Sequence, residues 1–215
     1  MQKTDEFKSD AAGILCLLPY IESTGIRQII EESNYPETTQ ISRLSSILSF
    51  VALKASDVRR YTADNIRCMD KGSGLFAGLN VLPKAAWLTS YSDRVTSDMN
   101  KDFLIKLSKK WIELGLIKET FNLDFTTIPY WGDSEHLENN WSGKRNKALP
   151  SMLAVLAQDQ ESGIIDYGDT NIMHKDESTV ILEFIDFYKT GSEGKMDLKY
   201  LVFESKFTNL KTSTA

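Results

Sequence analysis

The sequence predicts an α+β protein, in which an all-helical region at residues 1–115 precedes an α/β region at residues 116–215. Apolar residues recur every three or four positions through most of the first region, as a helix with one buried face requires. After about Gly115 the pattern changes to alternating apolar and polar residues, which is typical of strands. A chain of 215 residues suits one or two domains. The predicted domain boundary lies where the pattern changes.

The composition is that of an ordinary soluble protein. Hydrophobic residues make up 41% of the chain and charged residues 26%, which excludes a disordered tail and a membrane protein. The apolar run at residues 11–20 is too short to span a bilayer and contains Pro19. The charged first ten residues lead to no signal-peptide cleavage site. We therefore expect a cytoplasmic protein with no membrane partner.

The charge and the metal-binding side chains restrict the function further. The net charge of −5 argues against a protein whose whole surface binds nucleic acid, but permits a local basic patch. Two histidines and no C-x-x-C pair make a zinc site a poor expectation. Cys16 and Cys68 lie in apolar helical patterns, so we expect them to be reduced residues of the core.

The first half of the helical region reads as a series of short helices. Residues 11–35 predict one or two helices that stop before Pro36, and residues 41–55 predict a helix with one buried face. Residues 57–68 predict a further helix. It carries Arg59, Arg60 and Arg67.

The second half of this region contains a glycine-rich segment. Residues 72–77, GSGLFA, match the dinucleotide-loop pattern G-x-G-x-x-A, but residues 61–70 before them look helical rather than like a strand. We therefore predict a turn-rich connector. A short helix with Trp87 follows, and residues 99–114 predict a long helix with an apolar stripe.

The α/β region predicts the order strand, strand, strand, helix, strand. A polar loop is expected between the first two strands, and a tight turn joins the second and third in a hairpin. The first and last strands are expected to be parallel neighbours, because a helix separates the third strand from the last. The predicted strands are 119–129, 151–158, 164–172 and 199–203, the loop is 130–147, and the helix is 176–190.

Asp124 is the candidate around which the site is predicted. Leu123 and Phe125 alternate with it, so the strand would bury those two side chains and hold the carboxylate on the opposite face. Its partner could be a metal ion, an arginine or a hydrogen-bond donor, and a solvated strand Asp is also possible. Glu204 directly follows the last strand. Two acids on neighbouring strands are what a divalent-metal site needs.

Four segments resemble the DDE-type insertion-sequence transposases of the IS-four-like group. The likeness extends from about Leu15 to Lys206. The segments are LFAGLNVLPKAAWLTSYSDR, DFTTIPYWGD, NWSGKRNKALPSMLAVLAQD and YLVFESK. This resemblance implies a ribonuclease H-like catalytic domain, here incomplete, and a DNA transposase that performs metal-dependent strand cleavage and strand transfer.

The resemblance also implies roles for particular acids. Three acids would hold two Mg²⁺ (or Mn²⁺) ions, with Asp124 as the first and Glu204 where the family has an Asp. The glutamate side chain is longer by one methylene, which puts the metal geometry in doubt. Lys206 matches the lysine that follows the second acid. The third acid, a Glu on a later helix, has no counterpart before Ala215, so we expect a truncated chain that holds metal weakly and does not cut DNA alone.

The expected partners are DNA transposon ends, with a homodimer or association with a full-length transposase as a further possibility. Residues 1–115 take the place of a DNA-binding or dimerisation region. Lys144, Arg145 and Lys147 are the candidates for contact with substrate phosphates, together with Lys206, although a plain solvated loop would look the same. Weaker candidates in the helical region are Arg43, Arg59, Arg60, Arg67 and Arg94.

Two alternatives remain open. A transposase remnant could bind DNA or the full-length enzyme without catalysis, and a helical interaction module with a small α/β appendage would have no link to transposition. Five further acids are predicted to lie in turns or on exposed faces and are assigned no chemistry. They are Asp133, Asp159, Asp166, Asp169 and Asp186.

Overall fold

The fold is α+β, as the sequence predicts, with helices and a mixed sheet of five strands where four were expected. The computed structural model describes residues 6–58, 68–130, 132, 135, 137–143, 145–170 and 172–203. The chain divides into two compact units between Phe103 and Leu104. That division lies inside a helix, and the assignment of separate functional domains on either side of residue 115 stays a prediction.

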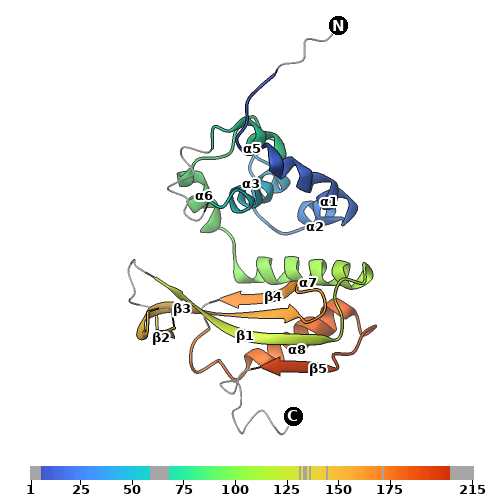
Figure 1. The fold of residues 1–215 in the computed structure, drawn as a ribbon, viewed down its shortest axis with the longest axis vertical. Helices are drawn as coiled ribbons and strands as arrows, with labels where there is room; N and C mark the ends of the chain where they lie inside the picture. The colour runs from blue at the N-terminus through green and yellow to red at the C-terminus, as the bar shows by residue number, and fades with distance from the viewer. Residues whose placement is uncertain are drawn as a thin grey trace. The chain divides into compact units, whose positions relative to one another are not determined.

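The first unit is built from short helices around one apolar core. Buried side chains such as Ile30, Leu48, Leu53 and Phe76 come from three helices and form one cluster. The helices are η1 (a 3₁₀ helix, Ala12–Leu17), α1 (Leu18–Ser23), α2 (Ile26–Glu31), α3 (Arg43–Ala55), α5 (Lys71–Phe76), α6 (Ala85–Ser92) and the first part of α7 (Ser97–Glu113) (Figure 1).

Residues 71–83 were predicted to be a turn-rich connector, which is wrong for the helix α5 and right for residues 77–83, where the chain forms turns and irregular structure. The Asp70 carboxylate caps α5 by accepting a hydrogen bond from the backbone N–H of Ser73 at 2.8 Å. A Cβ atom on Gly74 would lie 2.6 Å from the backbone carbonyl of Asn80. Glycine is therefore needed for close packing of this helix, and a nucleotide phosphate is not needed to explain it.

Two other expectations for this unit are answered in part. Cys68 is buried as predicted, whereas Cys16 is exposed, and neither cysteine forms a disulfide. Ile14 is the buried residue of η1, and Cys16 lies two positions after it. Because a 3₁₀ helix has three residues per turn, side chains two positions apart lie on different faces. The predicted helix at 57–68 falls on residues 59–67, which lie outside the described part of the chain.

The second unit is a mixed sheet covered on one face. Antiparallel pairs join β1 to β3 and β3 to both β2 and β4, while β5 runs parallel to β1, as predicted. Figure 1 shows β4, β3, β1 and β5 side by side. The elements are β1 (Thr120–Pro129), β2 (Asn139–Ser142), β3 (Lys147–Asp159), β4 (Ile165–Thr170), α8 (Val180–Ser192) and β5 (Tyr200–Phe203).

Helix α8 buries aromatic side chains against the sheet. Phe184 and Tyr188 contact Phe121 of β1, with ring centroids 5.2 and 5.5 Å apart. The residues of α7 from Leu104 onward add apolar side chains to the same cluster, among them Trp111. The opposite face of β1, with Asn122, Asp124 and Thr126, has no part in this cluster.

Strand β2 is a correction, because residues 130–147 were predicted to be a polar loop. Two polar residues of β2 are buried: the Asn140 amide donates to the Ser151 carbonyl at 3.0 Å, and Ser142 is 6% exposed. β3 accordingly begins at Lys147 rather than Ser151. Hydrogen-bonded burial of polar side chains gives a strand a loop-like composition.

No helix in the described part of the chain is long and apolar enough to cross a membrane. The cytoplasmic location stays a prediction.

Candidate metal and nucleic-acid site

The alternation along β1 places Asp124 as the sequence predicts. Leu123 is 2% exposed and Phe125 is partly buried in the α8-covered core, whereas Asp124 is exposed on the other face. Its cross-strand neighbour on β3 is Leu156. A carboxylate in this position reaches solvent, where a cation can approach it.

The parallel strand β5 supplies the second half of the predicted site. Its register pairs Leu123 with Phe203, the last residue of the strand. Asp124 is the next residue of β1, and Glu204 is the next residue of the sequence after β5. Glu204 itself and Lys206 lie outside the part of the chain that the structure describes.

The residues with defined positions contain no group of three or more His, Cys, Asp or Glu side chains that could hold a metal ion. Of the described acids, Asp124 is the one that the site prediction uses. A carboxylate is a hard oxygen donor that suits Mg²⁺ or Mn²⁺. The fit of a metal to the site therefore depends on what Glu204 adds to Asp124.

The predicted phosphate contacts lie at the turn between β2 and β3. Arg145 and Lys147 are both exposed, and Lys144 lies outside the described residues. The backbone N–H of Arg145 donates to the Ser142 carbonyl at 3.0 Å, and Asn146 adopts a left-handed conformation with φ 50°. Asparagine tolerates this conformation better than most residues. The turn thus presents Arg145 to solvent.

A hollow beside this turn was not predicted from the sequence. It has a volume of about 670 Å³, and it contains an exposed aromatic residue, Trp141, together with Arg145. Trp141 lies between the buried residues Asn140 and Ser142, so its side chain takes the open side of β2. The sequence Asn140-Trp141-Ser142 alternates, but its inward-facing residues are polar, so the segment resembles a loop and not a strand. The full lining is Phe125, Thr126, Thr127, Pro129, Trp141, Ser142, Gly143 and Arg145.

A smaller hollow of about 240 Å³ contains a polar network around His174. The His174 backbone N–H donates to the Glu138 carboxylate at 2.7 Å, and its Nε2 lies 2.9 Å from the Asn140 side-chain oxygen. Glu177 lies 3.9 Å from the same nitrogen. These contacts connect β2 to the segment before α8, and they account for His174 as a structural residue.

Two acids predicted to be exposed or in turns are buried. Asp159, 0% exposed, accepts hydrogen bonds from the backbone N–H groups of Lys118 and Ser162 at 2.8 and 2.7 Å. Burial opposes ionisation, but these hydrogen bonds hold the pKa of Asp159 below its usual value. Its carboxylate fixes the β3–β4 turn.

Asp166 is the clearer correction, because it was predicted on an exposed face and is 3% exposed. The Ser108 hydroxyl of α7 donates to one carboxylate oxygen at 2.7 Å, which explains why the side chain turns inward. The other oxygen, Oδ1, has no hydrogen-bond partner among the residues that the structure describes. Burial raises the pKa of Asp166 to about 6, and the charge of Asp159 adds to the rise.

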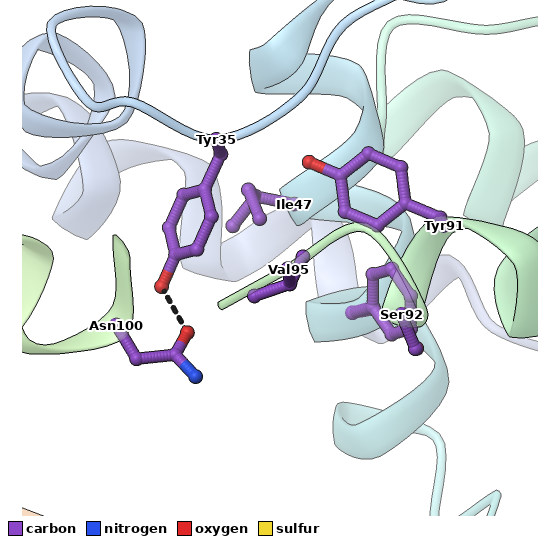
Figure 2. A pocket seen from close by; sticks show the side chains of 7 residues that line it. Tyr35, Ile47, Tyr91, Ser92, Val95 and Asn100 are labelled. Atoms are coloured by element: carbon purple, nitrogen blue, oxygen red, sulfur yellow. Dashed lines mark hydrogen bonds between the residues drawn. The ribbon is translucent and has the colours of Figure 1, made fainter. Parts of the chain in front are cut away.

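The helical unit contains a hollow of its own, of about 330 Å³. Figure 2 shows Tyr35, Ile47, Tyr91 and Val95 around it, with the Tyr35 hydroxyl donating to the Asn100 side-chain oxygen at 2.9 Å. The described residues of its lining are uncharged. The DNA-binding or dimerisation role of this region stays a prediction.

Two of the arginines predicted to contact DNA have structural partners. Arg43 donates from its guanidinium to the backbone carbonyls of Glu31 and Tyr35, each at 2.7 Å. Arg94 lies over the ring of Tyr91, 5.3 Å from its centroid. Arg43 is thus engaged in joining α2 to α3. Arg59, Arg60 and Arg67 lie outside the described residues.

No family model, curated protein or solved structure matches the chain.

Proposed function

We propose that this chain is a DDE-type DNA transposase of the IS-four-like group, in which Asp124 and Glu204 hold a divalent metal ion that acts on DNA. One observation carries the proposal: β5 lies parallel to β1 in the register Leu123 to Phe203. Each candidate acid is the residue directly after that pair in its own segment of sequence.

The topology supports the same proposal. The strands β4, β3, β1 and β5 follow one another across the sheet, and α8 connects β4 to β5. A ribonuclease H-like domain has this arrangement of three antiparallel-connected strands, a helix and a parallel strand. The resemblance of the sequence segments, and not the topology alone, selects a transposase among proteins with such a sheet.

The metal would be held by carboxylate oxygens, which Mg²⁺ and Mn²⁺ prefer. When bound, it supplies a lower pKa for the attacking oxygen and stabilisation of charge on the phosphate. The protein contributes position, because Asp124 is anchored in the middle of a ten-residue strand that pairs with β3 over nine residues. Arg145 and Lys147 offer exposed positive charge to the phosphates of the DNA.

The alternative is a non-catalytic relative that binds DNA or a full-length transposase. The glutamate at position 204 favours it, because the longer side chain fits the tight geometry of Mg²⁺ differently from aspartate. We assign no third acid on this chain. Metal binding, rather than strand cleavage, is therefore the first measurement to make.

The experiment is a Mn²⁺ titration followed by the electron paramagnetic resonance signal of the free ion. The wild-type chain is expected to remove free Mn²⁺ from solution, and Asp124→Asn and Glu204→Gln are each expected to weaken binding at least about tenfold. Asp186→Asn, which changes an exposed acid of α8, is the matched control. Equal binding by the wild type and Asp124→Asn would contradict the proposal, and DNA binding without metal binding would favour the alternative.

A further inference from the structure

The hollow beside the β2–β3 turn combines an exposed indole with a cation. Trp141 is 59% exposed, Arg145 lies four residues later at the turn, and hydroxyl groups of Thr126, Thr127 and Ser142 belong to the lining. We propose that this hollow is a subsite for one unpaired nucleotide of a single DNA strand, with its base stacked on Trp141 and its phosphate at Arg145. The inference rests on the proposed function and specifies the form of its substrate.

The backbone around Trp141 is fixed before any ligand arrives. Trp141 pairs with Ala148 in the β2–β3 ladder, and the Thr127 hydroxyl donates to the Trp141 carbonyl at 3.1 Å. Its neighbours Asn140 and Ser142 are each 6% exposed, which leaves the open side of the strand to the indole. Because the backbone of Trp141 is fixed, only the two side-chain torsions of the indole have to be ordered on binding, and stacking contributes more fully to affinity.

The turn determines where the cation lies. The hydrogen bond from Arg145 N–H to the Ser142 carbonyl and the left-handed Asn146 close a four-residue loop between the paired residues Ser142 and Lys147. Arg145 therefore lies near the same strand end that presents Trp141. An aromatic face beside a guanidinium is the combination by which proteins bind single strands without strong sequence preference.

The position of the hollow relates it to Asp124. Thr126 lines the hollow and lies two residues beyond Asp124 on the same face of β1, whereas Phe125, Thr127 and Pro129 of the lining alternate with it. Two residues of a strand cover about 7 Å. A DNA strand whose scissile phosphate is at Asp124 would therefore bring a nearby nucleotide to the Thr126 side of the hollow. Bases in a duplex are already stacked on each other, so the subsite selects an unpaired one.

A protein segment matches this hollow less well than a nucleotide does. A protein segment bound here would meet an exposed indole beside an arginine, and an apolar side chain alone would match only the indole. A nucleotide supplies a flat apolar base and an anionic phosphate together. We therefore propose single-stranded DNA as the ligand of this hollow, and the experiment tests it against duplex DNA.

The test uses fluorescence anisotropy of a labelled twelve-nucleotide oligothymidine, in chelator and at low salt, with the full chain. We expect Trp141→Ala to weaken binding about tenfold, since stacking on one aromatic residue accounts for about that factor. Trp141→Phe should retain most of the affinity. Tyr20→Ala removes an aromatic side chain of similar exposure, 69%, from α1, and should leave binding unchanged.

A second arm tests the phosphate contact. Arg145→Gln should make the logarithm of the affinity less dependent on salt, with a slope reduced by about 0.7 for one phosphate of a single strand. The same-length duplex should bind the wild type more weakly than the single strand. Trp141→Ala is expected to fold, because the indole is on the surface, and circular dichroism checks this.

Oligothymidine binding that is equal in wild type and Trp141→Ala would overturn the subsite, as would no binding at all or tighter binding of the duplex. The chelator keeps this outcome separate from the proposed function. If the wild-type chain binds no Mn²⁺ but its DNA binding depends on Trp141, the metal site alone is contradicted. Mn²⁺ binding at Asp124 with Trp141-independent DNA binding would contradict the subsite alone.

Discussion

The buried carboxylate of Asp166 makes a quantitative prediction about stability. Its pKa rises from 3.8 to about 6 in the folded chain, mainly because of burial, with Ser108 opposing the rise and Asp159 adding to it. A pKa difference of about two units corresponds to about 3 kcal/mol of free energy. Because the folded pKa is the higher one, the protonated acid is compatible with folding at low pH. The cost appears as the pH rises through the interval between 3.8 and about 6.

Asp166→Asn removes the charge and keeps a side-chain oxygen that can accept from the Ser108 hydroxyl. The asparagine amide group would take the position of Oδ1, which has no described hydrogen-bond partner. Leaving this group unpaired reduces the gain in the free energy of unfolding by about 1 kcal/mol or more. We therefore expect the variant to be more stable than the wild type by about 2 kcal/mol above pH 7. The difference should shrink to below about 1 kcal/mol at pH 4, where the wild-type carboxyl is largely protonated.

The assay is urea unfolding followed by circular dichroism at pH 7.5 and pH 4, with Asp186→Asn as the control for removal of an exposed acid. Ser108→Ala is the complementary variant. It removes the donor to a buried carboxylate and should lower the free energy of unfolding at pH 7.5 by about 1.5–3 kcal/mol. An Asp166→Asn variant no more stable than wild type at pH 7.5, or a difference that stays constant with pH, would refute the reasoning.

Three further predictions concern local packing and association. Asp70→Ala removes the cap of α5 and should cost about 1 kcal/mol in urea unfolding, a result that an unchanged midpoint would contradict. Gly74→Ala should cost about 1–3 kcal/mol because its Cβ would overlap the Asn80 backbone, whereas Gly13→Ala, with nothing within 4 Å, should be tolerated; equal effects would count against this. Val202→Lys should reduce self-association in sedimentation velocity, because Val202 is 57% exposed on β5, a strand that pairs only with β1 among the described strands; an unchanged distribution would exclude this edge.

The sequence predicted the elements whose side chains follow a strict period. Leu123 and Phe125 alternate with Asp124, so the strand and the exposed face of the acid follow directly from the pattern. The long stripe of α7 was equally readable. The helix between the third and last strands allowed a parallel neighbour for β1, and β5 takes that place. Local periodicity and chain connectivity suffice for these features.

The features that the sequence did not predict depend on contacts between distant residues. Asp166 reads as a surface acid until Ser108, on another element, is placed beside it. Asn140 and Ser142 read as loop residues until Ser151 accepts the Asn140 amide and both become buried. The exposure of Trp141 follows from that burial, so the candidate subsite was hidden for the same reason. Polar side chains satisfied by tertiary partners have no signature in local composition.

The proposed metal site at Asp124 and Glu204 is tested most directly by locating a bound cation. Mn²⁺ added at a small fraction of the protein concentration broadens the backbone amide signals nearest to it in a nuclear magnetic resonance spectrum. We predict the strongest broadening at Leu123, Asp124 and Phe125 of β1 and at Phe203 of β5, and its loss in Asp124→Asn. Broadening that is strongest around Glu138 and Glu177, or that persists in the variant, would contradict a metal site shared by these two strands.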